Sequence, residues 1–287
     1  MSANGWAVVV IFLPPALLLF TVFVFLPIVE AGWFGFFHWD GYGPPQKFIG
    51  FKNYGYLFGN ATFNRALINN GLVIAVSLLV QQPLALGVAL MVAGRITGAA
   101  WFRMIFFLPY VLADVAAGLI WHFMFDGSFG LSSVVTGALG LEPYYLLADK
   151  TWAFSAVLIV ILWKYFGFYT MLYVAGLQGI DRSLLEAAEM DGASVFQRFR
   201  HITLPLLGPM IRLAIFFSVV GSLKLFDFIP PLTGGGPFET TNTMVSYLYY
   251  FGITRMRFGY SSAVGVVLFV ICVAFAFGYQ RLFMRDD

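Results

Sequence analysis

Two ionisable side chains lie inside long apolar runs of the sequence, and they carry opposite charges. Asp114 lies in LPYVLADVAAGLIW and Lys164 lies in LIVILWKYFGFYT. A charge held in such surroundings costs free energy and indicates either an ion pair or a functional site. Similar depths and opposite signs permit an ion pair. Three roles stay open: a pair that only joins two helices, contact with a solute in an aqueous cavity, and a proton relay.

The motifs of common catalytic chemistry are missing from the sequence. It contains no Gly-Lys pair, which the phosphate-binding loop of an ATPase requires. The histidines His38, His122 and His201 lie too far apart for a metal-binding motif, and no G-x-S-x-G elbow is present. Cys272 is the only cysteine, so no intrachain disulfide can form. We therefore expect no catalytic site, no metal site and no cofactor in this chain, and any transport must draw energy from a partner or an ion gradient.

A strongly polar segment, SLLEAAEMDGASVFQRFRHITLP, separates two of the apolar runs at residues 183–205. Ser183 and Glu186 have the spacing of a helix capping box, and so do Ser194 and Gln197. Gly192 suits the left-handed position just past a helix end. The pattern predicts two short helices with a bend at Gly192, with Pro205 opening the next apolar run.

The acids of this segment lie mainly on its first helix. Helices that lie on a membrane surface usually carry Lys and Arg on their polar face. An acidic, pre-shaped helix with small alanines beside it suits a groove on a protein partner. Both a surface helix pair and a docking segment stay open on this evidence.

A third group of residues lies in the run LPLLGPMIRLAIFFSVVGSLKLFDF. Ser218, Gly221 and Ser222 are polar or small, and positions 218 and 222 share one helix face. Small residues of this kind allow close packing between membrane helices.

The elements that must position these residues are membrane-spanning helices. Of the 287 residues, 60% are hydrophobic and only 10% are charged, whereas soluble domains have roughly a quarter charged. About 20 apolar residues span the hydrocarbon core as a helix. Six stretches qualify, at about 6–29, 68–93, 103–125, 152–175, 206–228 and 260–283. The expected fold is an all-α membrane protein with a single polytopic domain over 1–287.

The distribution of Lys and Arg predicts the orientation. With six spans both termini lie on one side, and that side carries eight of these residues near span ends against six on the other. Cytoplasmic loops are enriched in Lys and Arg. We expect both termini, and the segment 183–205, to be cytoplasmic. The net charge of +2 is small and its basic residues are scattered, so no nucleic-acid partner is expected.

The polar segment resembles the coupling ("EAA") motif in permease subunits of binding-protein-dependent ABC importers. The residues concerned are Glu186-Ala187-Ala188, Asp191-Gly192-Ala193, Ile202 and Leu204-Pro205. Other stretches are similar to the carbohydrate-uptake branch, the maltose and glycerol-phosphate type. They are Phe48-Ile-Gly50 with Asn53-Tyr54, Phe107-Leu-Pro109-Tyr110, Ala175-Gly176-Leu177-Gln178 and the stretch Leu232 to Pro237. The resemblance covers about residues 33 to 283.

The resemblance implies a six-helix type I importer permease in a bacterial or archaeal inner membrane. It implies half of a pathway for a sugar, oligosaccharide or polyol derivative. It also implies these partners: a second homologous permease subunit, two ATPase subunits that bind ATP and Mg²⁺, and an external solute-binding protein. A gradient-driven transporter and a non-transporting scaffold or receptor stay open as alternatives.

The resemblance also assigns site residues. In segment 181–205 it places the ATPase contact at Glu186, Ala187, Ala188, Asp191, Gly192, Ala193 and Phe196. Glu186 could cap its helix, contact the ATPase, or do both. For the solute pathway it indicates Tyr165, Phe168, Ser218, Gly221 and Ser222. Asp114 and Lys164 are further candidates from their place in the apolar runs, and an acid at position 114 is unusual in the family. Hydroxyl groups with aromatic faces suit a sugar.

Overall fold

The chain is almost entirely helical in the computed structural model, which describes residues 3–94 and 98–283. Its backbone divides into two compact units. Unit 1 holds Met1–Asn64 and Tyr247–Val273, and unit 2 holds Arg65–Ser246 and Ala274–Asp287. The single domain expected over residues 1–287 stays a prediction.

Unit 1 combines a long apolar helix with a small sheet. Strands β1 (Phe37–His38) and β2 (Lys47–Phe48) pair antiparallel, with Phe37 opposite Phe48. The Asn53 side-chain amide donates to the carbonyls of Gly35 and Phe37, both at 2.9 Å, and so fixes the chain beside the sheet. The helical elements are α1 (Ala3–Phe20), η1 (Thr21–Phe25), α2 (Leu26–Phe34), α3 (Lys52–Phe58), the start of α4 (Ala61–Val76), the end of α15 (Met244–Tyr249), η5 (Tyr250–Thr254) and most of α16 (Phe258–Phe283).

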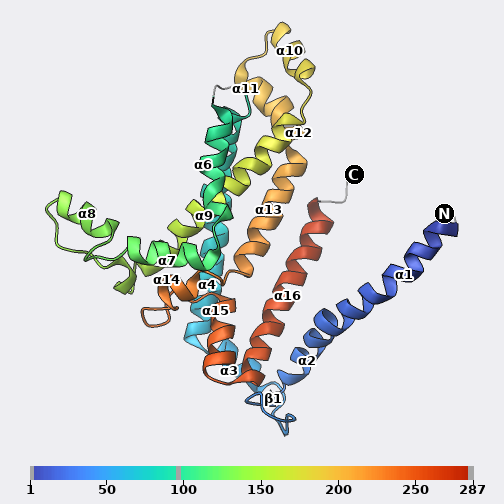
Figure 1. The fold of residues 1–287 in the computed structure, drawn as a ribbon, viewed down its shortest axis with the longest axis vertical. Helices are drawn as coiled ribbons and strands as arrows, with labels where there is room; N and C mark the ends of the chain where they lie inside the picture. Colours follow the sequence, from blue (N-terminus) through green and yellow to red (C-terminus); the bar gives the residue numbers. More distant parts are fainter. Residues whose placement is uncertain (1–2, 95–97, 284–287) are drawn as a thin grey trace. The chain divides into compact units, whose positions relative to one another are not determined.

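Unit 2 is built around one long helix, α9 (Ala153–Gln178), which packs against α5 (Gln82–Val92) and α6 (Ala99–Val111) (Figure 1). Gly167 lets α6 approach closely, because a Cβ atom there would overlap the carbonyl oxygen of Phe106. The other elements are η2 (Ser77–Gln81), α7 (Asp114–Met124), α8 (Leu131–Ala138), η3 (Leu146–Ala148), α10 (Arg182–Met190), α11 (Val195–Arg198), η4 (Phe199–Thr203), α12 (Leu204–Leu206), α13 (Gly208–Leu223) and α14 (Ile229–Thr233).

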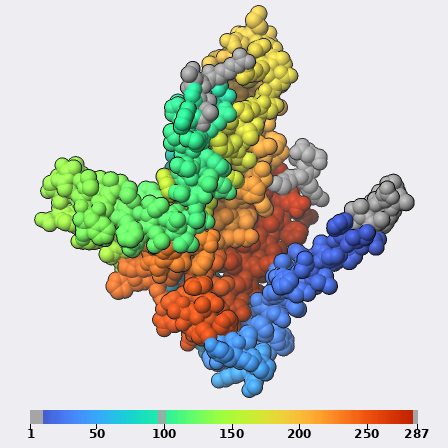
Figure 2. All heavy atoms as spheres, viewed as in Figure 1, coloured from blue at the N-terminus to red at the C-terminus, as the bar shows by residue number. Residues whose placement is uncertain are grey.

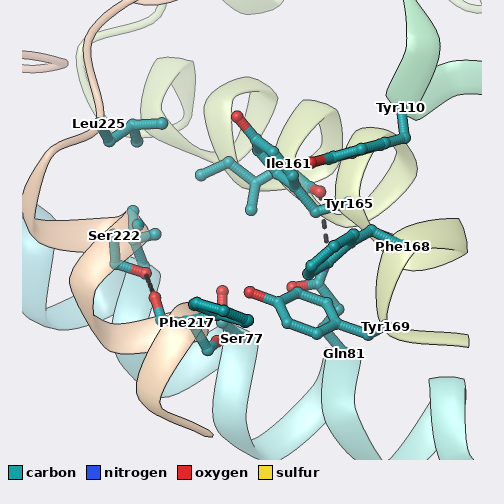
Figure 3. Close-up of a pocket in the computed structure, with 13 residues that line it drawn as sticks. Ser77, Gln81, Tyr110, Ile161, Tyr165, Phe168, Tyr169, Phe217, Ser222 and Leu225 are labelled. Carbon is teal, nitrogen blue, oxygen red and sulfur yellow. Dashed lines mark hydrogen bonds between the residues drawn. The ribbon is translucent and has the colours of Figure 1, made fainter. Parts of the chain in front are cut away.

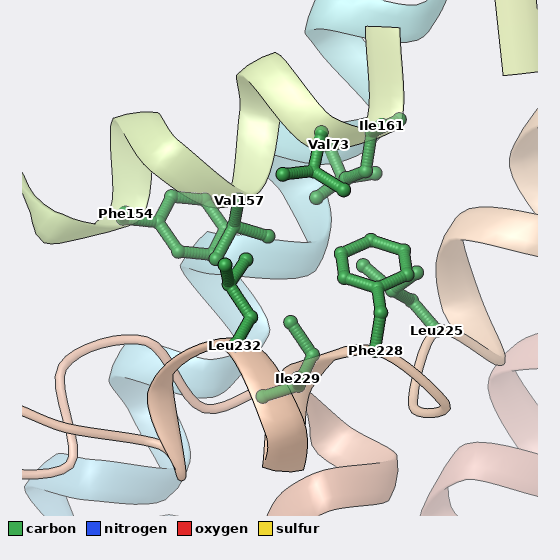
Figure 4. Close-up of a cluster of buried hydrophobic side chains, with 9 residues drawn as sticks. Val73, Phe154, Val157, Ile161, Leu225, Phe228, Ile229 and Leu232 are labelled. Carbon is green, nitrogen blue, oxygen red and sulfur yellow. The ribbon is translucent and has the colours of Figure 1, made fainter. Parts of the chain in front are cut away.

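A cluster of buried apolar side chains joins α9 to α4 and to the segment around α14 (Figure 4). Close packing of such side chains holds the helices together through van der Waals contacts. The cluster consists of Val73, Phe154, Val157, Val160, Ile161, Leu225, Phe228, Ile229 and Leu232.

Within residues 3–94 and 98–283, four helical stretches are long and apolar enough to cross a membrane, and two bent helix pairs raise the total to six if each pair is one span. The four are Val10–Phe34, Ala61–Val92, Ala153–Gln178 and Phe258–Phe283. Each coincides with a predicted span. The predicted spans 103–125 and 206–228 are the two that bend.

The expectation of one unbroken helix over 103–125 is wrong. α6 and α7 meet at 96°, because Leu112 and Ala113 adopt extended backbone angles. Asp114 is therefore the first residue of α7 and does not lie in the middle of a helix. A carboxylate at a helix N-terminus interacts favourably with the helix dipole, so this position suits an acid.

The expected boundary at Pro205 is also misplaced. The helical run of the coupling segment continues to Leu206, and a 65° bend separates it from α13, which ends at Leu223. Pro209 explains the new start, because a proline lacks the amide hydrogen that a helix interior needs but fits the first turn.

Three π turns precede a proline by the same spacing. η1, η2 and η4 each end two residues before a proline, at Pro27, Pro83 and Pro205. A proline ring collides with the carbonyl four residues earlier in a regular helix. The wider π turn moves that carbonyl aside, so the helix continues through the proline. Residues within such a turn are rotated from their regular α-helical positions.

Candidate functional site

The polar segment forms two short helices joined by a bend, as predicted. α10 ends at Met190, and Gly192 takes the left-handed angle φ +80° before α11 begins. The capping box of α11 is confirmed: the Ser194 amide donates to Gln197 Oε1 at 2.7 Å, and the Gln197 amide donates to Ser194 Oγ at 3.3 Å. Glu189 and Arg198 form an ion pair between the two helices.

The first predicted capping box is wrong. α10 begins two residues earlier than expected, and its N-cap is Asp181, whose carboxylate accepts a hydrogen bond from the Ser183 amide at 2.9 Å. The same hydrogen bond holds the pKa of the Asp181 carboxyl below its ordinary value. Glu186 consequently has no capping role, and its carboxylate makes no hydrogen bond or ion pair with the described part of the chain.

The remaining coupling candidates also lie at the surface of unit 2. Glu186, Ala187, Asp191, Gly192 and Phe196 are exposed, and Ala188 and Ala193 are partly exposed. Figure 2 shows this segment, in yellow, with its side chains uncovered at the end of the unit. Its contact with an ATPase stays a prediction.

Asp114 and Lys164 form the ion pair that their depths permit. Lys164 Nζ lies 2.9 Å from Asp114 Oδ1, and the lysine side chain is 2% exposed while the aspartate is 31% exposed. Lys164 also donates to the carbonyls of Leu112 at 2.6 Å and Pro109 at 3.4 Å. These carbonyls have lost their helical partners at the break between α6 and α7, so Lys164 stabilises that break.

Five of the predicted pathway residues line one cavity of about 460 Å³ within unit 2. Tyr165 and Phe168 come from α9, and Ser218, Gly221 and Ser222 come from α13. Asp114 and Lys164 are not among its lining residues. The volume lies in the range of about 300–1,000 Å³ typical of small-molecule sites.

Aromatic rings form one wall of this cavity (Figure 3). Tyr110 of α6 stacks on Phe168, with centroids 4.9 Å apart, and Phe217 of α13 lies 6.2 Å from Phe168. On α13, Ser222 Oγ donates to the Ser218 carbonyl at 2.7 Å, which confirms that the two serines share a face. The wall thus offers ring faces beside hydroxyl oxygens.

Further lining residues were not predicted from the sequence. They are Val73, Ser77, Gln81, Tyr110, Ile161, Tyr169, Phe217 and Leu225. Ser77 and Gln81 are the first and last residues of the π turn η2. The sequence does show two glutamines before Pro83 in an apolar run. Their place at the cavity could be recognised only once the π turn η2 was known.

Among the described residues, no group of three or more His, Cys, Asp or Glu side chains could hold a metal ion.

Comparison with known proteins places these features in context. Residues 82–285 match the model of the family described as "Binding-protein-dependent transport system inner membrane component". The diacetylchitobiose uptake system permease protein NgcF of Streptomyces coelicolor is 35% identical over 278 residues, covering 92% of this chain and 79% of the relative. The sulfoquinovosyl glycerol transport system permease protein SmoG of Agrobacterium fabrum is 34% identical over 280 residues, covering 97% and 91%.

A solved structure has the same fold. It is the crystal structure of a bacterial ABC transporter involved in the import of the acidic polysaccharide alginate. The TM-score is 0.86 at 24% identity, and the match covers 99% of this chain and 97% of that chain.

Proposed function

Because the chain belongs to the family of binding-protein-dependent transport system inner membrane components, we propose that it forms half of the pathway of an ATP-driven importer for a sugar, oligosaccharide or polyol derivative. Members of this family are multi-pass permeases and not the ATPase of the transporter. The observation that carries the sugar class is the cavity, where ring faces and hydroxyl groups lie together. The relatives import different solutes, so similarity alone does not select one.

The proposed assembly contains four kinds of component. A second, homologous permease subunit completes the pathway, two ATPase subunits bind ATP and Mg²⁺, and an external binding protein delivers the solute. In this arrangement the termini and α10 to α11 are cytoplasmic. ATP binding and hydrolysis shift the population of the assembly between inward-facing and outward-facing states, because the two states differ in affinity for the nucleotide-bound ATPase.

The coupling segment is the proposed joint with the ATPase. The exposed residues of α10 and the bend enter a cleft of that subunit, with Glu186 and Asp191 supplying charge and Ala187 and Ala188 allowing close approach. The free carboxylate of Glu186 supports a contact across this joint, because no partner within the described chain occupies it. Phe196 adds an exposed ring beside the bend.

Reconstitution tests the proposal directly. The chain, its second permease subunit, the candidate ATPase and the binding protein are incorporated into proteoliposomes, and uptake of radiolabelled sugars is measured with and without ATP. Uptake that requires ATP and the binding protein supports the importer. ATP-independent uptake that collapses with an ionophore indicates a gradient-driven transporter, and absence of any flux indicates a scaffold; either result refutes the proposal.

A further inference from the structure

The cavity in unit 2 has an uncharged lining. None of the described residues that line it is acidic or basic. Its polar groups are the hydroxyls of serines and tyrosines and one side-chain amide. An anionic group that leaves water for a largely apolar cavity requires a cation or several hydrogen-bond donors. The lining therefore bears on which sugars the proposed pathway accepts.

Gln81 contributes a buried acceptor to this lining. The residue is 1% exposed, and its Nε2 atom donates to the carbonyls of Ile161 at 3.0 Å and Leu162 at 3.3 Å. These two bonds fix which end of the amide is nitrogen. Its Oε1 atom is buried and has no hydrogen-bond partner within the described chain. A buried acceptor left in this state costs free energy, and a donor from a solute would remove that cost.

The nearest lysine on α9 cannot serve an anionic solute. An ammonium group has three N–H donors. Those of Lys164 face Asp114 and the carbonyls of Leu112 and Pro109. A phosphate, sulfonate or carboxylate would have to displace one of these partners at the helix break.

The ion pair leaves no free cation beside the cavity. Lys164 Nζ lies 2.9 Å from Asp114 Oδ1, so the two charges balance each other. None of the described lining residues carries a charge that could offset an anion. Both the acceptor at Gln81 and the lack of an available cation disfavour an anionic sugar.

We propose that this cavity selects neutral sugars, with Gln81 Oε1 accepting a hydrogen bond from a sugar hydroxyl while the rings of Tyr110, Phe168 and Phe217 cover an apolar sugar face. Gln81 is then a specificity-determining residue. The inference rests on the proposed function, because it assumes that the cavity lies on the sugar route. It narrows the proposed substrates to neutral sugars, and it gives Gln81 of the π turn η2 a role in recognising them.

The first test compares neutral disaccharides with their phosphorylated and uronate counterparts. Uptake of each sugar is measured in the reconstituted four-component assembly with ATP, and each sugar's binding is measured on the permease–ATPase complex in nanodiscs. ATP-dependent uptake restricted to neutral sugars is expected. ATP-dependent uptake of an anionic sugar overturns the inference and leaves the importer standing. Absence of ATP-dependent uptake of every sugar overturns both.

The second test assigns the acceptor to Gln81. A series of monodeoxy analogues of the best neutral sugar is compared in wild type and Gln81→Met by binding to the complex in nanodiscs. Removal of the sugar hydroxyl that donates to Gln81 Oε1 should weaken binding to the wild type by about tenfold. The same removal should leave binding to Gln81→Met unchanged. A merely structural Gln81 would weaken binding of every analogue equally, and that outcome overturns the assignment.

A charge introduced at Gly221 provides a matched control for the electrostatic argument. A Cβ atom at Gly221 meets no atom within 4 Å, so a side chain can enter the cavity from α13. Both side chains take up space in the cavity and should weaken binding of every sugar, so the readout is the ratio of the affinities for a phosphorylated and a neutral sugar. Gly221→Arg should shift this ratio toward the phosphorylated sugar by at least about tenfold compared with Gly221→Met, since arginine stays protonated. An unchanged preference would show that cavity charge does not select the solute and would overturn the inference.

Discussion

At the scale of single residues, Lys164 stabilises two features with one ammonium group. It forms an ion pair with Asp114, and it donates hydrogen bonds to the carbonyls of Pro109 and Leu112 at the end of α6. This geometry favours the role in which the pair joins two helices, because no N–H of Lys164 is left for a solute. The Asp114 carboxylate is partly exposed and could still be reached by a solute. Contact between Asp114 and a solute therefore stays a prediction.

Lys164→Met should therefore destabilise the permease strongly. The change leaves Asp114 without its counter-ion and leaves the carbonyls of Pro109 and Leu112 without a donor. Removal of one member of a buried pair costs about 3–5 kcal/mol. The thermal melting temperature of the purified complex measures the effect.

Asp114→Asn is the matched comparison: the asparagine still accepts a hydrogen bond, but Lys164, whose side chain is 2% exposed, loses its counter-ion, so this variant should also be destabilised. The double variant should recover only part of the loss, since the two carbonyls still lack a donor. Full recovery in the double variant would contradict the capping role of Lys164. Lost uptake in Asp114→Asn at unchanged melting temperature would assign the acid to the solute pathway.

Gly221 provides a second prediction at this scale. Gly221→Leu should block sugar uptake while the complex assembles normally, because the added side chain occupies the cavity and meets no packed neighbour. Gly221→Ala is the control: it adds only a Cβ atom to open space and should keep most of the uptake. Uptake assays and size-exclusion chromatography of both variants check this. Wild-type uptake by Gly221→Leu would place the solute elsewhere.

At the scale of elements, the close approach of α6 and α9 depends on Gly167. Gly167→Ala should destabilise unit 2, because the new Cβ would overlap the Phe106 carbonyl and force the helices apart. Overpacking of this kind costs about 1–3 kcal/mol or more. Gly87→Ala on α5 is the control, since its Cβ meets no neighbour and alanine favours a helix. Equal melting temperatures for the two variants would contradict the packing argument.

The four long helices could be predicted from composition, because apolar length alone identifies a span. The break between α6 and α7 could not. Leu112 and Ala113 carry no local breaking signal, and the extended backbone there is stabilised by Lys164, 52 residues away along the chain. A tertiary contact of this kind produces no recognisable pattern in the sequence around the break.

Only some of the residues that line the cavity could be predicted from the sequence. Tyr165 and Phe168 came from the family resemblance, whereas Ser218 and Ser222 also stood out in the sequence as hydroxyl residues that share one face of an apolar helix. Gln81 and Ser77 were missed, because their place depends on the π turn before Pro83. The first capping box was predicted wrongly because a nearby residue caps the helix instead. The carboxylate of Asp181, two residues before Ser183, accepts a hydrogen bond from the Ser183 amide, so the helix starts earlier.

At the scale of the whole molecule, the proposed ATP-driven transport requires that motion at the ATPase reach the spans. The segment from α10 to α12 is suited to this because its parts are fixed to one another. The capping box orders α11, the Glu189–Arg198 ion pair joins it to α10, and the helical run continues to Leu206 beside α13. A force applied at the exposed face of α10 is then transmitted as a displacement and is not absorbed by a flexible loop.

The bend at Gly192 provides the test of this coupling. Gly192→Val should abolish ATP-driven uptake, because a β-branched residue is strained at φ +80° and would reshape the bend, although no neighbour obstructs the side chain. Gly192→Asn is the matched control, since asparagine tolerates this angle, and it should retain most of the uptake. The melting temperature should stay unchanged in both variants, because the bend lies outside the packed core. Solute-stimulated ATPase activity measured beside uptake locates the defect. Wild-type uptake in Gly192→Val would refute the coupling role, whereas lost uptake with unstimulated ATPase places the fault at the joint between this chain and its energy source.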